Sequence, residues 1–177
     1  MRLWSIQPFE SLEELENTGI FIPKKEKSRN INVYNYAYKW LICQMNEKLN
    51  TDYTNYPIWM WHTFEGERQE PNLDNAGFVK VDGKRILYNL DVPEDNLVLS
   101  DFEKWQFVLE NTFVLDETIS EEKLLEIENN IDTLPKLELQ EKIEETWINV
   151  FNVKNSKYIQ ATMFNLKKEF VSSYKII

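Results

Sequence analysis

The segment from Tyr56 to Phe64 constrains the fold most strongly, because it reads Tyr-Pro-Ile-Trp-Met-Trp-His-Thr-Phe. Such a density of aromatic and β-branched side chains favours a strand over a helix. Alternation along a strand divides the side chains between two faces, with Ile58, Met60 and His62 on one and Trp59, Trp61 and Thr63 on the other. Both faces are largely apolar, so we expect a strand in the interior of a sheet or beside a pocket.

Helical periodicity is strongest between Asn32 and Leu49. Apolar side chains recur there at steps of three and four residues, at Tyr34, Tyr38, Leu41, Ile42, Met45 and Leu49. Cys43 lies within this pattern, and we expect its thiol to pack in the core. Two acidic amphipathic helices are predicted over 120–131 and 136–151, separated near Pro135.

Two Ser-x-x-Glu spacings indicate the starts of further helices. Ser11 precedes Glu14 and Ser100 precedes Glu103 by three residues, so each serine is predicted to cap a helix in a capping box. Gly19 follows the first of these helices, and we expect it to end that helix in left-handed backbone.

Short extended segments surround the helices. Strands are predicted at 2–8, 20–22, 97–99, 158–166 and 170–177, and a hairpin is predicted from 78–81 to 84–90 across Asp82-Gly83. The length suits one domain with its own core. We therefore expect a single α+β domain over residues 1–177, with a mixed or antiparallel sheet, flanking helices and an acidic helical region at about 100–151 inserted before the final strands.

Charge is distributed unevenly along the chain. Thirty Asp and Glu stand against 20 Lys and Arg, for a formal net charge of −10. Between Asp91 and Glu145 there are 17 acidic residues and four lysines, a net of −13, which leaves +3 for the rest. Such a region repels the phosphates of nucleic acid, so direct nucleic-acid binding by it is not expected. It is predicted either to bind a basic partner protein or to be a solvated surface.

Several classes of protein are excluded by what the sequence lacks. One Cys and one His rule out an internal disulfide and any site built from several cysteines or two histidines. No apolar run approaches the roughly 20 residues of a membrane span, and no signal-peptide pattern follows the first Met, so we expect a cytoplasmic protein without a membrane segment. Motifs of the P-loop, dinucleotide-binding, serine-hydrolase and zinc-protease types are absent from the sequence.

Two weaker arrangements of reactive side chains remain. Cys43 and His62 are the residue types of a nucleophile and its base, although a thiol in a periodic helix is more often structural. Asp91, Glu94 and Asp95 carry oxygen ligands for a hard cation, but they lack the alternating donors of a calcium loop and fit a surface cluster better. No metal site is predicted.

Aromatic side chains are the better candidates for a binding site. Rings large enough to line a pocket for a planar base occur at Trp4, Trp59, Trp61 and Phe64. Core packing is the commoner role of such rings. Guanidinium groups that suit a phosphate occur at Arg2, Arg68 and Arg85. Of these, we take Trp59 and Trp61 as candidate ligand-binding residues, and Arg2 and Arg68 as candidate phosphate-binding residues.

Four segments carry a family resemblance: Arg2-Leu-Trp-Ser-Ile-Gln-Pro8, Tyr56-Pro-Ile-Trp-Met-Trp61, Leu99-Ser-Asp-Phe-Glu-Lys-Trp105 and Gln160-Ala-Thr-Met-Phe-Asn-Leu166. They span nearly the whole chain. In these segments the sequence resembles an uncharacterised bacterial and phage family, domain of unknown function family 3841. The resemblance implies no established activity.

A more distant resemblance is topological, since the order of strand, short helix, glycine, strand, long helix and late strands is similar to the ADP-ribosyltransferase fold. That resemblance implies a nucleotide ligand, NAD or another. By position it places Ser5 and Gln7 in a first-strand site, Gln160 where the fold carries a catalytic Glu, and His62 close to them. Ser5 replaces the usual His or Arg, and neutral Gln160 lacks the charge that stabilises an oxocarbenium-like transition state. These departures favour nucleotide binding or altered chemistry over ordinary ADP-ribosyl transfer.

Two functional hypotheses follow, and neither decides whether the protein is an enzyme. The first is a nucleotide-binding, ADP-ribosyltransferase-like domain, which requires Ser5, Gln7, His62 and Gln160 to converge within hydrogen-bonding distance. The second is a non-enzymatic protein whose acidic region binds a basic partner, for example a phage-borne inhibitor of a host nucleic-acid-binding or defence protein. A domain that binds a small ligand without transforming it is also compatible with the sequence.

Overall fold

A six-stranded antiparallel sheet forms the centre of the molecule, with the strand order β5-β6-β3-β1-β4-β8. The computed structural model describes residues 1–24, 33–73, 83–116 and 118–177. The six strands are β1 (Arg2–Pro8), β3 (Ile58–Thr63), β4 (Arg85–Asp91), β5 (Val98–Asp101), β6 (Ile159–Met163) and β8 (Val171–Ile176). A second sheet pairs β2 (Ile20–Phe21) with β7 (Leu166–Lys167).

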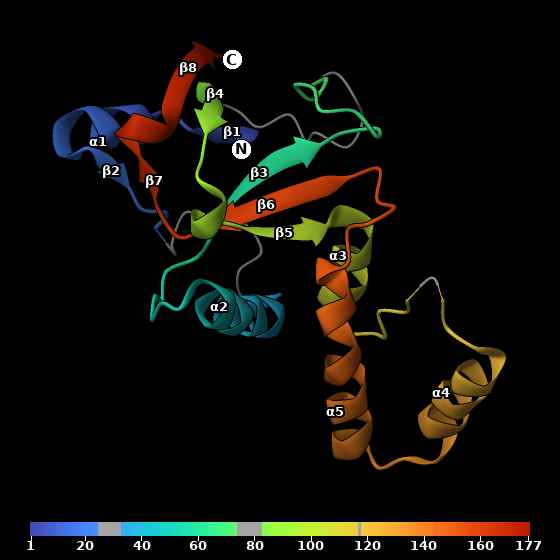
Figure 1. Ribbon diagram of the computed structural model, residues 1–177. Helices are drawn as coiled ribbons and strands as arrows, with labels where there is room; N and C mark the ends of the chain where they lie inside the picture. The colour runs from blue at the N-terminus through green and yellow to red at the C-terminus, as the bar shows by residue number, and fades with distance from the viewer. Residues whose placement is uncertain (25–32, 74–82, 117) are drawn as a thin grey trace.

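Helices cover both faces of the large sheet (Figure 1). α1 (Glu10–Thr18) and the two-stranded sheet lie on one side, and α2 (Asn35–Leu49) and α3 (Phe102–Leu109) lie on the other. α4 (Glu121–Thr133) and α5 (Lys136–Thr146) extend away from the sheet. The described 3-10 helices are η2 (Glu94–Asn96), η3 (Trp147–Phe151) and η4 (Lys168–Phe170). The predicted α+β class is confirmed.

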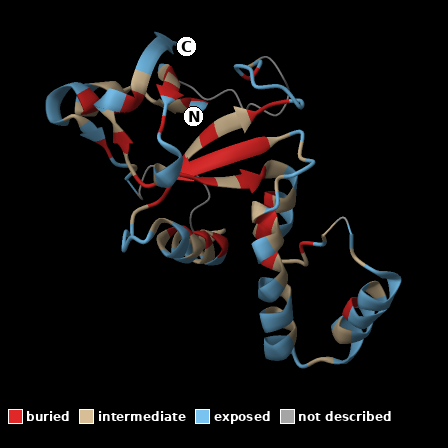
Figure 2. Cartoon of the chain, viewed as in Figure 1, coloured by how far each residue is buried: buried red, intermediate tan, exposed pale blue. Residues whose placement is uncertain are grey.

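The sheet separates two apolar cores. The core under α1 includes Leu3, Leu15, Ile58, Met60, Tyr88 and Met163, whereas the core under α2 and α3 includes Leu41, Met45, Trp105, Trp147 and Phe164. Figure 2 shows that burial is concentrated in the central strands and that β6 is buried along its whole length. The segment around β3 is therefore the interior strand that its two apolar faces predict.

The two predicted capping boxes are wrong, for different reasons. α1 begins at Glu10, so Ser11 lies inside the helix, where its hydroxyl is buried and 2.9 Å from the hydroxyl of Tyr88. α3 is capped one residue later than expected, because the carboxylate of Asp101 accepts the backbone N–H of Lys104 at 2.9 Å. The end of α1 follows the prediction, since Gly19 has φ of 80° and donates its N–H to the carbonyl of Leu15.

Two further expectations concern the helix and the hairpin that flank β3 in sequence. Periodicity placed Cys43 in the core, but its thiol is exposed on α2, because it lies outside the stripe of Ala37, Leu41 and Met45 that is buried. The second strand of the hairpin is present as β4. Its first strand at 78–81 and the first residue of its turn, Asp82, lie outside the described residues.

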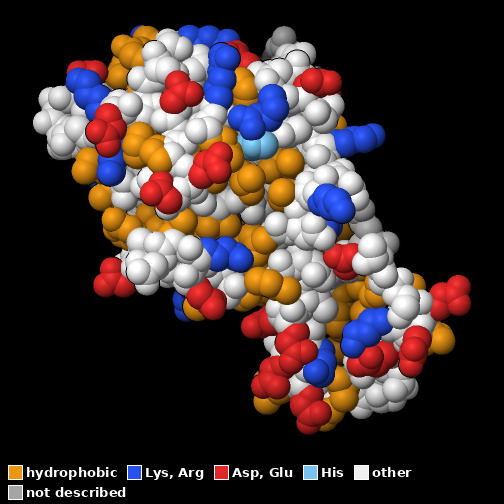
Figure 3. Space-filling model, viewed as in Figure 1, with side chains coloured by type: hydrophobic (Ala, Val, Ile, Leu, Met, Phe, Trp, Pro, Cys, Tyr) orange, Lys and Arg blue, Asp and Glu red, His pale blue; other side chains and the backbone are white. Residues whose placement is uncertain are grey.

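The acidic helix α4 forms where it was predicted, whereas α5 ends at Thr146 and the rest of the predicted helix, 147–151, is the 3-10 helix η3. The hydroxyl of Ser120 accepts the N–H of Lys123 and so caps α4. Trp147 and Val150 of η3 are buried. Acidic side chains gather on the surface of these helices (Figure 3), and Leu125, Ile131 and Leu137 are exposed beside them. Within the described ranges, no helix combines the length and apolarity that crossing a membrane would require.

Candidate functional site

A pocket of about 260 Å³ opens between α1 and α2, at the end of the sheet where β1 finishes and β3 begins. Thirteen described residues line it: Ile6, Gln7, Pro8, Glu10, Glu14, Phe21, Pro23, Lys24, Tyr38, Tyr56, Pro57, Ile58 and Trp59. Its position follows from the pairing of two neighbouring strands. β1 and β3 are in register only at Trp4 and Trp61, so they diverge toward Gln7 and Ile58 and leave space between them.

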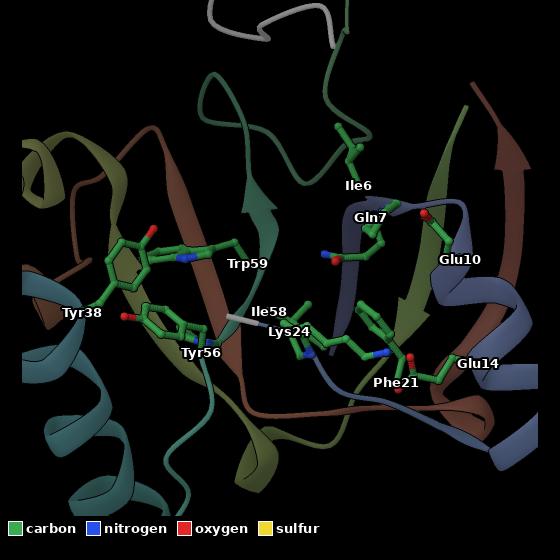
Figure 4. A pocket seen from close by; sticks show the side chains of 13 residues that line it. Ile6, Gln7, Glu10, Glu14, Phe21, Lys24, Tyr38, Tyr56, Ile58 and Trp59 are labelled. Carbon is green, nitrogen blue, oxygen red and sulfur yellow. The ribbon is translucent and has the colours of Figure 1, made fainter. Parts of the chain in front are cut away.

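A short chain of hydrogen bonds bridges the divergent strands. The hydroxyl of Ser5 donates to the backbone carbonyl of Trp59 at 2.8 Å, and the side-chain amide of Gln7 donates to the hydroxyl of Ser5 at 2.8 Å. This chain holds Gln7 in one orientation, with its amide end directed toward Trp59 (Figure 4). The carbonyl oxygen of the Gln7 side chain accepts no hydrogen bond among the described residues, and so remains available to a ligand.

Aromatic rings form the side of the pocket next to α2 (Figure 4). The ring centroid of Tyr38 lies 5.3 Å from that of Tyr56 and 6.4 Å from that of Trp59, the latter pair edge to face. Trp105 of α3 supports both Tyr38 and Trp59 from behind, at 5.9 and 5.3 Å. Tyr38 is held here because neighbouring Ala37 and Leu41 anchor α2 in the core.

Burial affects the polar atoms of this aromatic wall. It raises the pKa of the Tyr38 phenol, and the facing indole of Trp59 opposes that rise. The indole N–H of Trp59 is itself buried and has no acceptor in ordinary hydrogen-bond geometry within the described part of the chain. The phenol is therefore neutral at physiological pH, and the wall is apolar with hydrogen-bond donors at its edge.

The opposite side of the pocket is acidic. Glu10 and Glu14 are four residues apart on α1 and therefore lie on one face of that helix. Both line the pocket, across from Tyr38 and Trp59 (Figure 4). One carboxylate oxygen of Glu14 accepts a long hydrogen bond of 3.4 Å from the backbone N–H of Ile22. Lys24 lines the same side and supplies one ammonium against the two carboxylates.

The predicted four-residue convergence is wrong. Gln160 pairs with Trp61 of β3, which pairs with Trp4 of β1, so these three side chains share the face of the sheet toward α3. Because side chains alternate along a strand, Ser5 and Gln7 point to the opposite face. The sheet therefore separates Gln160 from Ser5 and Gln7. Strand register over long sequence distances decides this arrangement, and local patterns do not reveal it.

His62 lies with the two candidate phosphate-binding residues at the other end of the sheet. Its Nδ1 is 2.8 Å from the hydroxyl of Thr63, and its Nε2 contacts the guanidinium of Arg68. Arg68 also donates to the backbone carbonyl of Arg2 at 2.7 Å. Figure 3 shows this histidine at the surface next to basic side chains. Gln7 is five positions after Arg2 on β1, about 17 Å along an extended strand, so this cluster and the pocket are separate.

The environment of His62 keeps its imidazole neutral. Burial, the Arg68 guanidinium and the chain's amino terminus lower its pKa to about 4. Both ring nitrogens are engaged by Thr63 and Arg68. This leaves neither nitrogen to activate Cys43, which is exposed on α2.

A pH titration should detect the depressed pKa of His62. Because the neutral form is favoured in the native state, its contribution to stability is complete above the unfolded pKa of 6.5 and is lost as the pH falls toward 4. Partial solvent exposure reduces this contribution to about 1–2 kcal/mol. Comparing urea unfolding of wild type and His62→Gln at pH 7.5 and 4.5 isolates it, since Gln does not titrate. Equal losses in both proteins would contradict the assignment.

Sequence patterns identified only part of the pocket. Gln7 and Trp59 were candidate ligand-binding residues and line the pocket. Ser5 was also a candidate, and its hydroxyl accepts the hydrogen bond that orients the amide of Gln7. Glu10 and Tyr38 were missed, the former because it lies on an unremarkable acidic helix and the latter because its spacing is that of a core residue. Trp61 shares a face of β3 with Trp59 but lies outside the pocket, where it packs against Phe64 and Phe102.

The structure thus defines a class of protein: an α+β domain with a six-stranded antiparallel sheet and a partly aromatic, partly acidic pocket at one end of it. The chain belongs to the family described as Domain of unknown function (DUF3841), whose model matches residues 2–172. No curated protein and no solved structure matches it. The likeness to the ADP-ribosyltransferase fold is therefore without support.

Proposed function

We propose that this domain binds the base and sugar of a nucleoside or nucleotide in the pocket between α1 and α2. The observation that carries the proposal is the oriented amide of Gln7, which faces an aromatic wall built from Tyr38, Tyr56 and Trp59. Aromatic walls bind planar rings through dispersion and stacking, and an amide supplies both a donor and an acceptor for the edge of a base. Carboxylates at Glu10 and Glu14 suit sugar hydroxyls, which donate to them.

The size and charge of the pocket limit the ligand. Its volume of about 260 Å³ lies near the lower end for small-molecule sites, so it suits one nucleoside and not a whole dinucleotide. If NAD is a ligand, one of its two nucleosides occupies the pocket. Phosphate groups are expected to point outward, because the carboxylate of Glu14 repels them and the guanidinium groups of Arg2 and Arg68 lie at the other end of β1.

The lining residues offer contacts for recognition and no residue type of the common nucleophiles. Among the thirteen described residues there is no His, Cys, Ser or Thr, and the side chains that could exchange a proton include Glu10, Glu14 and Lys24. The acidic surface of α4 and α5 offers no comparable geometry. Its carboxylates are exposed, and Glu126 and Glu145 are paired with lysines of their own helices.

A thermal-shift series tests the proposal. We expect the four common ribonucleosides, their monophosphates, NAD and ADP-ribose to include at least one stabilising ligand, with a nucleoside preferred over its monophosphate. A ligand at a hundredfold excess over its dissociation constant stabilises the native state by about 2.7 kcal/mol. The stabilisation should be lost in Gln7→Ala and in Trp59→Leu.

Matched variants control for general loss of structure. Trp61 lies on the same strand but outside the pocket, so Trp61→Leu should keep the ligand response. Gln7 is only partly buried, and Gln7→Ala removes no large core volume, so that variant should remain folded by circular dichroism. Absence of a shift with every compound, or an undiminished shift in Gln7→Ala, would refute the proposed function.

A further inference from the structure

We infer that the pocket selects a base with an exocyclic amino group and that Ser5 sets this selection, an inference that rests on the proposed function and names its ligand more closely. The observations that carry it are the two hydrogen bonds of 2.8 Å that run from Gln7 to Ser5 and from Ser5 to Trp59. Together they decide which end of the Gln7 amide is free to meet a ligand.

The hydroxyl of Ser5 can serve Gln7 only as an acceptor. A hydroxyl has one hydrogen, and Ser5 donates it to the backbone carbonyl of Trp59, which cannot donate in return. Gln7 therefore turns its nitrogen to Ser5, because its carbonyl oxygen would place two acceptors face to face. Ser5 is 1% exposed, so bulk water has little access to its hydroxyl. The two orientations of the amide have nearly the same shape, but only one of them forms this hydrogen bond.

The oriented amide presents an acceptor to the pocket. One N–H of Gln7 is used by Ser5, which leaves the carbonyl oxygen and the second N–H for a ligand. Gln7 lines the pocket and is partly exposed, and its amide end lies toward Trp59 (Figure 4). A ligand that covers the oxygen without donating to it would leave a desolvated acceptor unpaired, which costs binding free energy. The matching ligand therefore supplies an N–H donor.

Amino bases supply that donor at their exocyclic group, and oxo bases present an acceptor there. The amino group and N7 of adenine fit a side-chain amide with two hydrogen bonds. Exchange of the amino group for an oxo group, as in hypoxanthine, keeps the shape of the ring but replaces the donor with an acceptor. Cytosine and uracil differ in the same way. A fixed amide distinguishes the members of such a pair, whereas an amide that is free to turn over accepts both.

Matched nucleosides test the inference directly. Adenosine and inosine, and cytidine and uridine, differ by the exchange of an amino group for an oxo group, and guanosine differs from inosine by an added amino group. By isothermal titration calorimetry the amino member of at least one pair should bind about tenfold more tightly than its partner. In Ser5→Ala the amide of Gln7 loses its fixed acceptor, so this preference should shrink to about threefold or less.

Control variants separate the role of Ser5 from a general loss of structure. Ser11→Ala removes another fully buried serine hydroxyl, which contacts Tyr88 and does not line the pocket, so it should keep the full preference. If Ser5→Ala weakens both members of a pair by the same factor, the role assigned to Ser5 is wrong. Gln7→Met keeps the length of the side chain without its amide and gives a second test if Ser5→Ala does not fold. A preference that survives in Gln7→Met would overturn the inference.

Failure of the inference and failure of the proposed function give different results. Equal affinities within the pairs that bind, a preference for the oxo member, or binding confined to nicotinamide compounds would overturn the inference and leave the proposed function standing. Absence of binding by every nucleoside and nucleotide, NAD included, would refute the proposed function itself.

Discussion

Replacing Trp147 with Ala should lower the free energy of unfolding by about 3–5 kcal/mol. Trp147 is 1% exposed and is the largest fully buried side chain in the described residues. Its indole N–H donates to the backbone carbonyl of Thr112 at 2.9 Å, and its ring meets that of Trp40 edge to face at 5.5 Å. The substitution therefore creates a cavity and leaves a carbonyl without its donor.

Urea unfolding followed by circular dichroism measures this loss. Leu137→Ala is the matched control, since Leu137 lies on the preceding helix with 81% of its surface exposed. Its change should stay within about 0.5 kcal/mol. A loss of less than about 1 kcal/mol for Trp147→Ala would show that the core under α2 and α3 is looser than its packing implies.

Much of the secondary structure was predictable because its signals are local. The alternation of side chains in β3, the apolar stripe of α2 and the glycine after α1 all act within a few residues, and all three elements form. Helix starts were less predictable, because a side chain far away in sequence can compete with the helix N-terminus for the hydroxyl of a serine. Ser11 instead contacts Tyr88, 77 residues away in sequence, and a periodicity analysis contains no trace of that contact.

The candidate site was predictable only in part, because it too depends on contacts between residues far apart in sequence. Gln7 and Trp59 were identified by residue type, but their meeting depends on the divergence of β1 from β3 after a single registered pair. The register of β1, β3 and β6 places Gln160 on the face of the sheet opposite to Gln7. A sequence reveals which side chains suit a ligand, whereas strand order and register decide which of them share a pocket.

Truncation of Leu41 should affect both stability and ligand binding. Leu41 is fully buried on α2, so Leu41→Ala should cost about 2–5 kcal/mol of unfolding free energy. The expected effect on binding follows from the position of Tyr38, which lies one turn earlier on the same helix and lines the pocket. A shift of α2 into the cavity left by Leu41 would move Tyr38 relative to Trp59, and the affinity for the stabilising ligand should fall.

Glu47→Ala provides the control for Leu41→Ala, because Glu47 is exposed on the same helix and outside the pocket. It should leave both the unfolding free energy and the dissociation constant near their wild-type values. Titration of folded Leu41→Ala at low temperature separates weaker binding from simple unfolding. Unchanged affinity in that variant, with the expected loss of stability, would mean that the pocket does not depend on how α2 packs. The aromatic wall would then be held mainly by Trp105, which contacts both Tyr38 and Trp59 from α3.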